Sequence, residues 1–261
     1  MAKNLVYYTV FGDDPYYENL RTSIDSLRDI GNFRGEILVF SDKPVTYRGA
    51  SNIVLPMPNS VESIQLRITC YKHFDFSAYN RILFLDLDII ACRDMNWLFD
   101  RDEDFTYFSQ IDHYFTTGVI NCSYMDWRTI RKHWWKRPLN AGQYLLSGRR
   151  FRAVMEQWEE VCDRFAHRRV FELNFSFKRV WRDQIAFNYL IRTGRLQGAH
   201  LDDVVRFPIR PVSLRPSRYT LCHYAAFPVK AAGAAMRRRY QWILAGNGTA
   251  DSVALYRENK R

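Results

Sequence analysis

The feature that most constrains this chain is a short apolar run that ends in two aspartates. The run is Arg81–Leu85, and Asp86, Leu87 and Asp88 follow it. About five apolar residues between polar ones predict a buried strand rather than a helix. Side chains at positions i and i+2 of extended chain point the same way, so the two carboxylates are expected to project together. A divalent cation is the simplest partner for such a pair, because carboxylate oxygens suit Mg²⁺, Mn²⁺ and Ca²⁺. The alternative is a solvated strand end.

Length and composition predict a single globular domain. The chain has 261 residues, of which 47% are hydrophobic and 25% charged, and we expect one domain over 1–261 with a basic C-terminal helix and tail at 229–261. No window approaches the roughly 18 uncharged apolar residues of a membrane span, and the start has no signal-peptide core. The cysteines are odd in number and widely spaced, which favours reduced thiols in a cytoplasmic protein. They are Cys70, Cys92, Cys122, Cys162 and Cys222.

The formal net charge of +10 admits three kinds of partner, namely nucleic acid, an anionic membrane or an anionic small substrate. The basic residues cluster rather than spread, and solvated helix faces are the alternative explanation. The clusters are Arg128, Arg131, Lys132, Lys136 and Arg137, then Arg149, Arg150 and Arg152, then Arg237, Arg238 and Arg239. A nucleic-acid binder is disfavoured because no recognition motif is visible.

Strands and helices alternate along the chain. Strands are predicted at 5–10, 36–40, 81–85, 105–108, 144–146 and 204–207, and helices at 20–30, 61–74, 149–165 and 181–191. This order predicts an α/β fold, with a mostly parallel central sheet and helices on both faces. Ligands of such sheets bind beyond the carboxyl ends of the strands. Neither a dinucleotide-binding glycine motif, nor a P-loop, nor a serine nucleophile elbow is present.

Three further segments carry polar residues in a recognisable order. They are Leu139-Asn140-Ala141-Gly142 before an apolar strand, Arg182-Asp183-Gln184 with Asn188 after it, and His223 followed by Lys230. Together with Asp86-Leu87-Asp88, they resemble glycosyltransferase family 8, which includes glycogenin and bacterial lipooligosaccharide galactosyltransferases. The resemblance runs from Val6 to about Lys230. One departure is Ala226, which stands where the family has a glycine.

The resemblance implies a GT-A (Rossmann-like) fold, a nucleotide-sugar donor that is usually UDP-linked, Mn²⁺ or Mg²⁺ as cofactor, and retention of anomeric configuration. The implied metal ligands are Asp86, Asp88 and His223. The residues that match its donor-sugar contacts and reaction centre are Asn140, Ala141, Asp183 and Gln184. Lys230 matches the lysine that holds the diphosphate, and Arg67 matches the family's donor-binding arginine. Thr9, Val10 and Asp13 match its contacts to the uridine.

The residue chemistry agrees with such a reaction. A cation held by two carboxylates acts as a Lewis acid on a leaving diphosphate, and an imidazole ligand favours Mn²⁺ over Mg²⁺. Asn140 and Gln184 can bond sugar hydroxyls. Asp183 is the obvious carboxylate for a covalent intermediate, whereas front-face attack needs none. We expect the front-face route, because Gln184 is a poor nucleophile. Because they match the reaction centre of the family, Asp183 and Gln184 are the expected catalytic residues.

The sequence thus predicts a metal-dependent retaining glycosyltransferase that moves galactose or glucose to a glycan or lipopolysaccharide-type acceptor. The alternative is a catalytically silent nucleotide-sugar or glycan-binding domain on the same fold. For single residues the alternatives are a core histidine at 223, a helix N-terminus at 183 and a surface lysine at 230. Five aromatic residues can stack on an acceptor sugar or pack in the core, namely Tyr114, Phe115, Trp127, Trp134 and Trp135.

The segment Val229–Leu244 mixes aromatic residues with three arginines. Such a helix can lie on an anionic membrane surface, where each basic residue contributes roughly 1 kcal/mol. We therefore expect a cytoplasmic enzyme with peripheral contact to the inner membrane face. The alternative is a helix packed on the protein with its arginines in water.

Overall fold

The computed structural model describes residues 3–56, 60–109, 131, 139–166, 182–201, 204–206, 219–225 and 227–247. The strands of the larger sheet are β1 (Asn4–Val10), β2 (Glu36–Ser41), β3 (Ser51–Val54), β4 (Arg81–Leu85), β6 (Phe105–Ser109), β7 (Leu139–Ser147) and β8 (Ala199–Leu201). The strands of the smaller sheet are β5 (Ile89–Ala91), β9 (Val205–Arg206) and β10 (Leu221–His223). The α-helices are α1 (Asp14–Asp29), α2 (Ser60–Thr69), α5 (Gly148–Ala166), α6 (Arg182–Arg192) and α7 (Val229–Trp242).

The larger sheet is mostly parallel, as predicted. Its order is β3-β2-β1-β4-β7-β6-β8, and β7 is the one strand of this described sheet that runs against its neighbours. The carboxyl ends of β1, β2 and β4 therefore meet at one edge. In the smaller sheet, β10 pairs antiparallel with β5 and parallel with β9.

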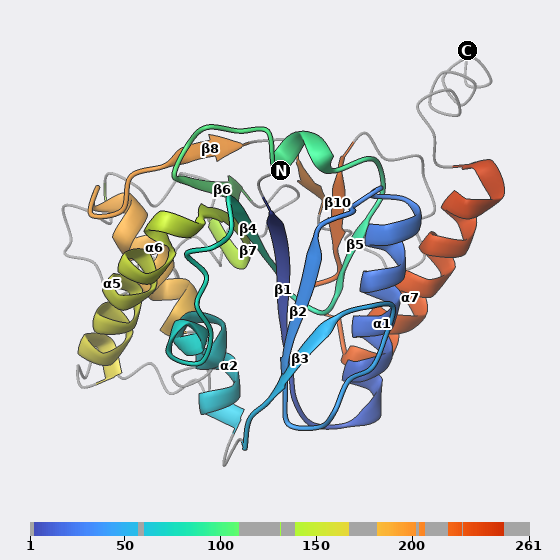
Figure 1. Ribbon diagram of the computed structural model, residues 1–261, viewed down its shortest axis with the longest axis horizontal. Helices are drawn as coiled ribbons and strands as arrows, with labels where there is room; N and C mark the ends of the chain where they lie inside the picture. Colours follow the sequence, from blue (N-terminus) through green and yellow to red (C-terminus); the bar gives the residue numbers. More distant parts are fainter. Residues whose placement is uncertain are drawn as a thin grey trace.

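Helices cover both faces of the larger sheet (Figure 1). Alternate residues of β1 serve the two faces: Leu5 and Tyr7 pack with residues of α2, α5 and α6, whereas Val6 and Tyr8 pack with α1. A strand that is buried on both sides reads as an uninterrupted apolar run, which is the pattern of β1 and β4. The prediction of helices on both faces is confirmed.

The C-terminal helix α7 lies beside α1 rather than on the larger sheet (Figure 1). The two helices approach closely at Gly233, where an added Cβ would lie 2.2 Å from the Asn19 side-chain oxygen. The side-chain amide of Asn19 also donates to the Val229 carbonyl at 3.2 Å. The remainder of the buried side of α7 packs over β5 and β10. This helix therefore supports the smaller sheet.

Several predicted elements need correction. The strand predicted at 144–146 is the much longer β7, and the strand predicted at 204–207 belongs to the smaller sheet. Four strands were not predicted, namely β3, β5, β8 and β10. Each of them is only three or four residues long, which is too short to display a two-residue period.

One part of the basic C-terminal segment also differs from expectation. Arg239 is 1% exposed, and its Nε donates to the Tyr224 hydroxyl at 2.8 Å, so it is not available to a membrane surface. Arg237 is exposed and pairs with Glu18 at 3.2 Å. None of the described helices is both long and apolar enough to cross a membrane. The four described cysteines form no disulfide with one another, in agreement with the prediction of reduced thiols, and Cys122 lies outside the described residues.

Candidate metal centre

The three predicted metal ligands converge in the structure. Asp86 follows β4 directly, and its backbone N–H donates to the Gly142 carbonyl at 2.7 Å. The chain then turns into β5, whose Ile89 pairs with His223 on β10. The Tyr224 N–H donates to the Asp88 carbonyl at 2.9 Å. The pairing of β5 with β10 therefore places the His223 imidazole beside the two aspartates, although His223 is far from them in the sequence.

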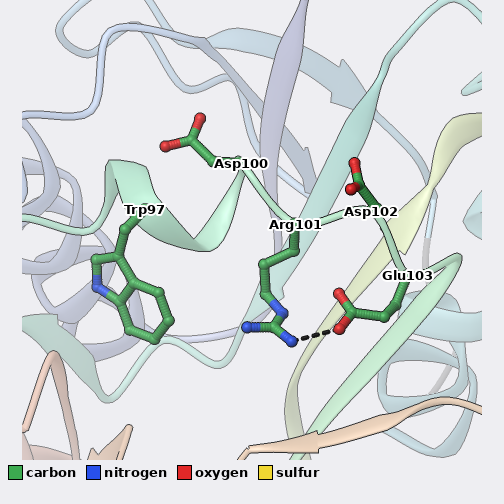
Figure 2. A pocket seen from close by; sticks show the side chains of 5 residues that line it. All are labelled: Trp97, Asp100, Arg101, Asp102 and Glu103. Carbon is green, nitrogen blue, oxygen red and sulfur yellow. Dashed lines mark hydrogen bonds and ion pairs between the residues drawn. The ribbon is translucent and has the colours of Figure 1, made fainter.

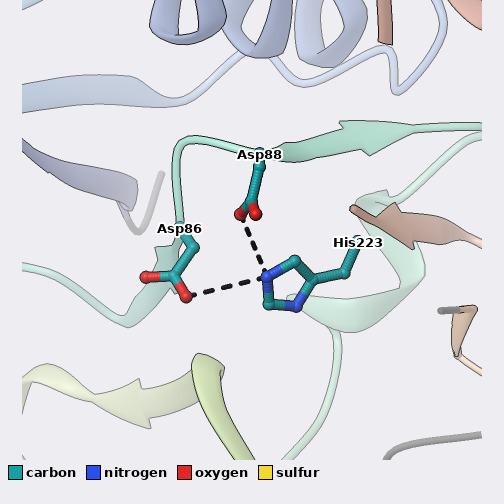
Figure 3. A group of neighbouring side chains, drawn as sticks. All are labelled: Asp86, Asp88 and His223. Atoms are coloured by element: carbon teal, nitrogen blue, oxygen red, sulfur yellow. Dashed lines mark ion pairs between the residues drawn. The ribbon is translucent and has the colours of Figure 1, made fainter. Parts of the chain in front are cut away.

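The ligand atoms of this cluster lie close together (Figure 3). The His223 Nε2 atom is 3.0 Å from Asp88 Oδ1 and 3.7 Å from Asp86 Oδ2, and the three ligand atoms all lie within 4.8 Å of one another. The His223 side chain is 2% exposed, whereas those of Asp86 and Asp88 are 33% and 26% exposed. The two carboxylates are thus partly exposed and the imidazole is buried behind them, so a cation can reach the cluster past the carboxylates.

The two carboxylates of the cluster favour a positive charge beside them, either a proton on His223 or a bound cation. Burial raises the pKa of Asp86 above 3.8, against the opposing influence of Arg67 and His223. Burial also acts to raise the pKa of Asp88, but the imidazole of His223 holds it below 3.8. Burial acts to lower the pKa of His223, and the facing carboxylates of Asp88 and Asp86 outweigh it and raise the pKa above 6.5. When no cation is bound, the facing carboxylates therefore favour the protonated form of the His223 imidazole.

Gly142 provides the space that the cluster needs. A Cβ at this position would lie 2.2 Å from Asp86 Oδ2 and 2.7 Å from His223 Cε1. Any other residue here would collide with the Asp86 carboxylate and the His223 imidazole and displace them. Two carboxylate oxygens and one imidazole nitrogen, with this gap preserved beside them, fit a divalent cation such as Mn²⁺.

Arg67 connects the cluster to the predicted reaction centre. It lies in the last turn of α2, and its Nη1 is 3.2 Å from Asp86 Oδ1, while its Nη2 pairs with the buried carboxylate of Asp183. The Arg67 carbonyl accepts hydrogen bonds from the hydroxyls of Tyr7 at 2.7 Å and Tyr144 at 3.1 Å. The carbonyls in the last turn of a helix lack a partner within the helix, and these two bonds satisfy the carbonyl of Arg67. They also hold the Arg67 backbone in place.

The residues predicted to contact the donor sugar lie in this same region. Asp183 and Gln184 begin α6 and are 2% and 6% exposed, and Asn140 and Ala141 of β7 are 5% and 0% exposed. Two side chains hold α6 in place. The Trp158 indole donates to the Asp183 carbonyl at 2.9 Å. The Asn188 side chain bonds both backbone groups of Leu139, at 3.0 and 2.8 Å. This second side chain ties α6 to the start of β7.

The remaining predicted residues lie farther out. Thr9 and Val10 end β1, which pairs in parallel with β4, and Asp13 is an exposed residue just before α1. Lys230 is exposed in the first turn of α7. No hydrogen bond or ion pair between Lys230 and the metal ligands occurs in the described part of the chain. Ala226 and the five aromatic residues proposed for the acceptor lie outside the described residues.

Sequence reasoning missed two residues at this centre, Gly142 and Gln143. Gly142 was noted in a motif but not assigned a role. The Gln143 side chain is 0% exposed, and its Oε1 is 3.1 Å from His223 Nδ1. A signal was present, because a glutamine stands directly before the apolar run Tyr144-Leu145-Leu146. A buried polar residue of this kind requires a hydrogen-bond partner.

A shallow hollow occurs elsewhere on the surface, lined by Trp97, Asp100, Arg101, Asp102 and Glu103 (Figure 2). It lies before β6, at the edge opposite the metal cluster, because β6 and β4 both run antiparallel to β7. This hollow is therefore separate from the candidate metal centre.

Comparison with protein-family models and with curated proteins gave no match to this chain. The fold and the site together define an α/β protein with a candidate divalent-metal centre at the carboxyl end of β4.

Proposed function

We propose that this protein is a metal-dependent retaining glycosyltransferase with a GT-A arrangement and a single catalytic domain. The observation that carries the proposal is the convergence of Asp86, Asp88 and His223 beside Arg67 and the Asp183-Gln184 pair. Its place at the carboxyl ends of parallel strands is where α/β sheets bind their ligands. The order of the sequence motifs, which resembles glycosyltransferase family 8, supports a nucleotide-sugar as the donor, with UDP as the expected nucleotide.

The metal ligands would hold Mn²⁺ or Mg²⁺ against the donor diphosphate. The cation supplies Lewis-acid stabilisation of the charge that develops on the leaving diphosphate. Arg67 adds a fixed positive charge on the other side of Asp86, and its planar group suits phosphate oxygens. Lys230, which is exposed and at the start of a helix, has a flexible stem that can bring its ammonium to the diphosphate.

The residues around the sugar favour front-face attack. Asp183 is almost fully buried and its carboxylate already pairs with Arg67, which makes it a poor nucleophile. Its role is to position Arg67 and the first turn of α6. Gln184 and Asn140 can donate and accept bonds to sugar hydroxyls. In this route, the leaving phosphate oxygen takes the proton of the attacking acceptor hydroxyl.

Turnover of nucleotide-sugars with Mn²⁺ tests the proposal. We expect release of the nucleoside diphosphate from UDP-galactose or UDP-glucose, a lower rate with Mg²⁺ and loss of turnover in excess EDTA. Calorimetry in Mn²⁺ should rank UDP above GDP, CDP and dTDP. Full activity in EDTA would contradict the metal assignment. Tight binding of a UDP-sugar with no turnover towards any acceptor would identify the silent binding domain instead.

The acceptor is proposed to be a glycan or a lipopolysaccharide-type glycolipid, reached from the cytoplasmic face of a membrane. The structure leaves Arg237 and Arg238 exposed on α7, while Arg239 is buried. Two arginines at roughly 1 kcal/mol each give only about 2 kcal/mol of attraction to an anionic surface. We expect weak, salt-sensitive co-sedimentation with anionic liposomes that the double change Arg237→Ser and Arg238→Ser removes. Equal binding to neutral vesicles would exclude this docking.

A further inference from the structure

Gln143 of β7 is a buried polar residue whose side chain is only partly hydrogen-bonded. It is fully buried, and no hydrogen-bond partner for its Nε2 atom occurs among the described residues. A buried amide N–H without a partner destabilises a fold, and an apolar residue of the same volume would avoid that penalty. Gln143 therefore contributes something other than stability.

The contact that Gln143 does make is with the metal ligand His223. Its Oε1 lies 3.1 Å from His223 Nδ1, on the side of the ring away from Asp88 and Asp86. A carbonyl oxygen can only accept, so the Nδ1 atom must carry the hydrogen and donate it. In the neutral ring, the lone pair then lies on Nε2, which faces the two carboxylates.

We infer that Gln143 is a positioning residue of the metal centre, one that selects the imidazole tautomer able to bind a cation. Without an acceptor at Nδ1, the neutral ring can place its hydrogen on Nε2 instead, where Asp88 Oδ1 at 3.0 Å accepts it. That tautomer forms a hydrogen bond within the cluster and moves the nitrogen lone pair to Nδ1, away from the two carboxylates, so that Nε2 cannot bind a metal. The inference rests on the metal site of the proposed function and goes beyond it.

The experiment compares Mn²⁺ affinity in three full-length proteins by electron paramagnetic resonance. Gln143→Met keeps the volume but removes the acceptor, and we expect an affinity about 10- to 100-fold lower than that of the natural chain. Gln143→Glu keeps an acceptor at Nδ1 and should retain the affinity within about threefold. Gln157→Met, on α5, is the matched control, because Gln157 bonds only the remote Arg195 carbonyl among the contacts described.

Two further readouts separate positioning from a structural role. Nitrogen-15 spectra of the metal-free protein at alkaline pH should show His223 as the Nδ1–H tautomer, and the Gln143→Met spectrum should shift towards Nε2–H. The melting temperature of Gln143→Met without metal should equal or exceed that of the natural chain. Unchanged Mn²⁺ affinity in Gln143→Met would overturn the inference alone. Failure of the natural chain to bind Mn²⁺ would overturn both the inference and the proposed function.

Discussion

Aspartates separated by one residue occur in two regions of this chain, Asp86-Leu87-Asp88 and Asp100-Arg101-Asp102, the second of which continues into Glu103-Asp104, and the surroundings of the two regions differ. The first follows a buried strand and meets His223 (Figure 3). The second lies in an exposed loop, where Arg101 pairs with Glu103 and the two aspartates point away from that pair (Figure 2). The spacing of the carboxylates is the same. What distinguishes them is the buried strand before the first pair and the imidazole that another strand delivers to it.

Removing either carboxylate of the first pair should have the largest effect. We expect Asp86→Asn or Asp88→Asn to lower nucleotide-sugar turnover by at least about 10³-fold, or roughly 4 kcal/mol of activation free energy, because the cation loses a charged ligand. The metal-free fold of Asp86→Asn should remain intact, since burial raises the pKa of Asp86 and its charge therefore opposes folding. Asp88→Asn should lower the metal-free stability somewhat, because the imidazole of His223 holds the pKa of Asp88 below 3.8 and the charge of Asp88 therefore favours the folded state. Asp100→Asn is the matched control and should retain full turnover. A comparable loss in this control would remove the distinction between the two segments.

Closing the space at Gly142 should have the next largest effect. The Cβ of Gly142→Ala would collide with Asp86 Oδ2 and His223 Cε1, so we expect Mn²⁺ affinity to fall by about 100-fold and unfolding free energy to fall by about 1–3 kcal/mol. Gly194→Ala is a suitable control, because its φ of +74° makes the substitution strained although nothing lies within 4 Å of the added Cβ. Titration with Mn²⁺ and urea unfolding measure both quantities. Equal loss of Mn²⁺ affinity in the two variants would point to general destabilisation.

The pH dependence of the unfolding free energy should reverse when Mn²⁺ is added. The pKa of His223 is raised above 6.5, so its contribution to metal-free stability is fully present below pH 6.5 and is lost as the pH rises through the folded-state pKa. Mn²⁺ requires the deprotonated Nε2 atom, so its affinity should fall by up to about tenfold per pH unit below that pKa. Urea unfolding at about pH 6 and about pH 8, in EDTA and in Mn²⁺, should give opposite trends. The same trend in both conditions, or one that persists in His223→Asn, would disagree with this assignment.

Making Asp100-Arg101-Asp102 identical in sequence to Asp86-Leu87-Asp88 should have the smallest effect on metal binding and on stability. Arg101→Leu converts the second segment to Asp-Leu-Asp and removes the partly exposed ion pair with Glu103, at a cost of at most about 1 kcal/mol. We expect no additional Mn²⁺ site, because no histidine faces Asp100 or Asp102 in the described part of the chain. Mn²⁺ stoichiometry in this variant on an Asp88→Asn background gives the answer directly. A new site there would mean that spacing alone suffices.

The elements that could be predicted from the sequence are those long enough to show a regular spacing of apolar residues. The strands β1, β2, β4 and β6 and the helices α5 and α6 were predicted within a few residues, whereas the helix predicted at 20–30 covers only the later part of α1 (Asp14–Asp29). The three residues of the candidate metal cluster were also predicted. The direction of β7 could not be predicted, because it depends on how the chain connects to it and not on its own residues. The strands β5 and β10, which join His223 to the aspartates, are each three residues long.

The contacts of the candidate site were less accessible to sequence reasoning than its residue types. Gln143 and His223 are 80 positions apart in the sequence, and only the tertiary fold brings their side chains together. Gly142 has the same limitation, since its importance lies in a distance to Asp86 and not in its own chemistry. That Arg239 is buried beside Tyr224 also depended on how α7 packs, although the run of three arginines suggested a solvated face.

The candidate metal cluster also lies between the two sheets. Asp86 extends β4 of the larger sheet, whereas His223 ends β10 of the smaller one. A cation bound between them would therefore act as a cross-link, and its binding free energy would add to the stability of the native state. A chain that ends before residue 223 would lack this cross-link altogether. During synthesis, all three residues of the cluster could share a cation only after β10 has emerged and docked, so metal occupancy would report that the smaller sheet has docked beside the larger one.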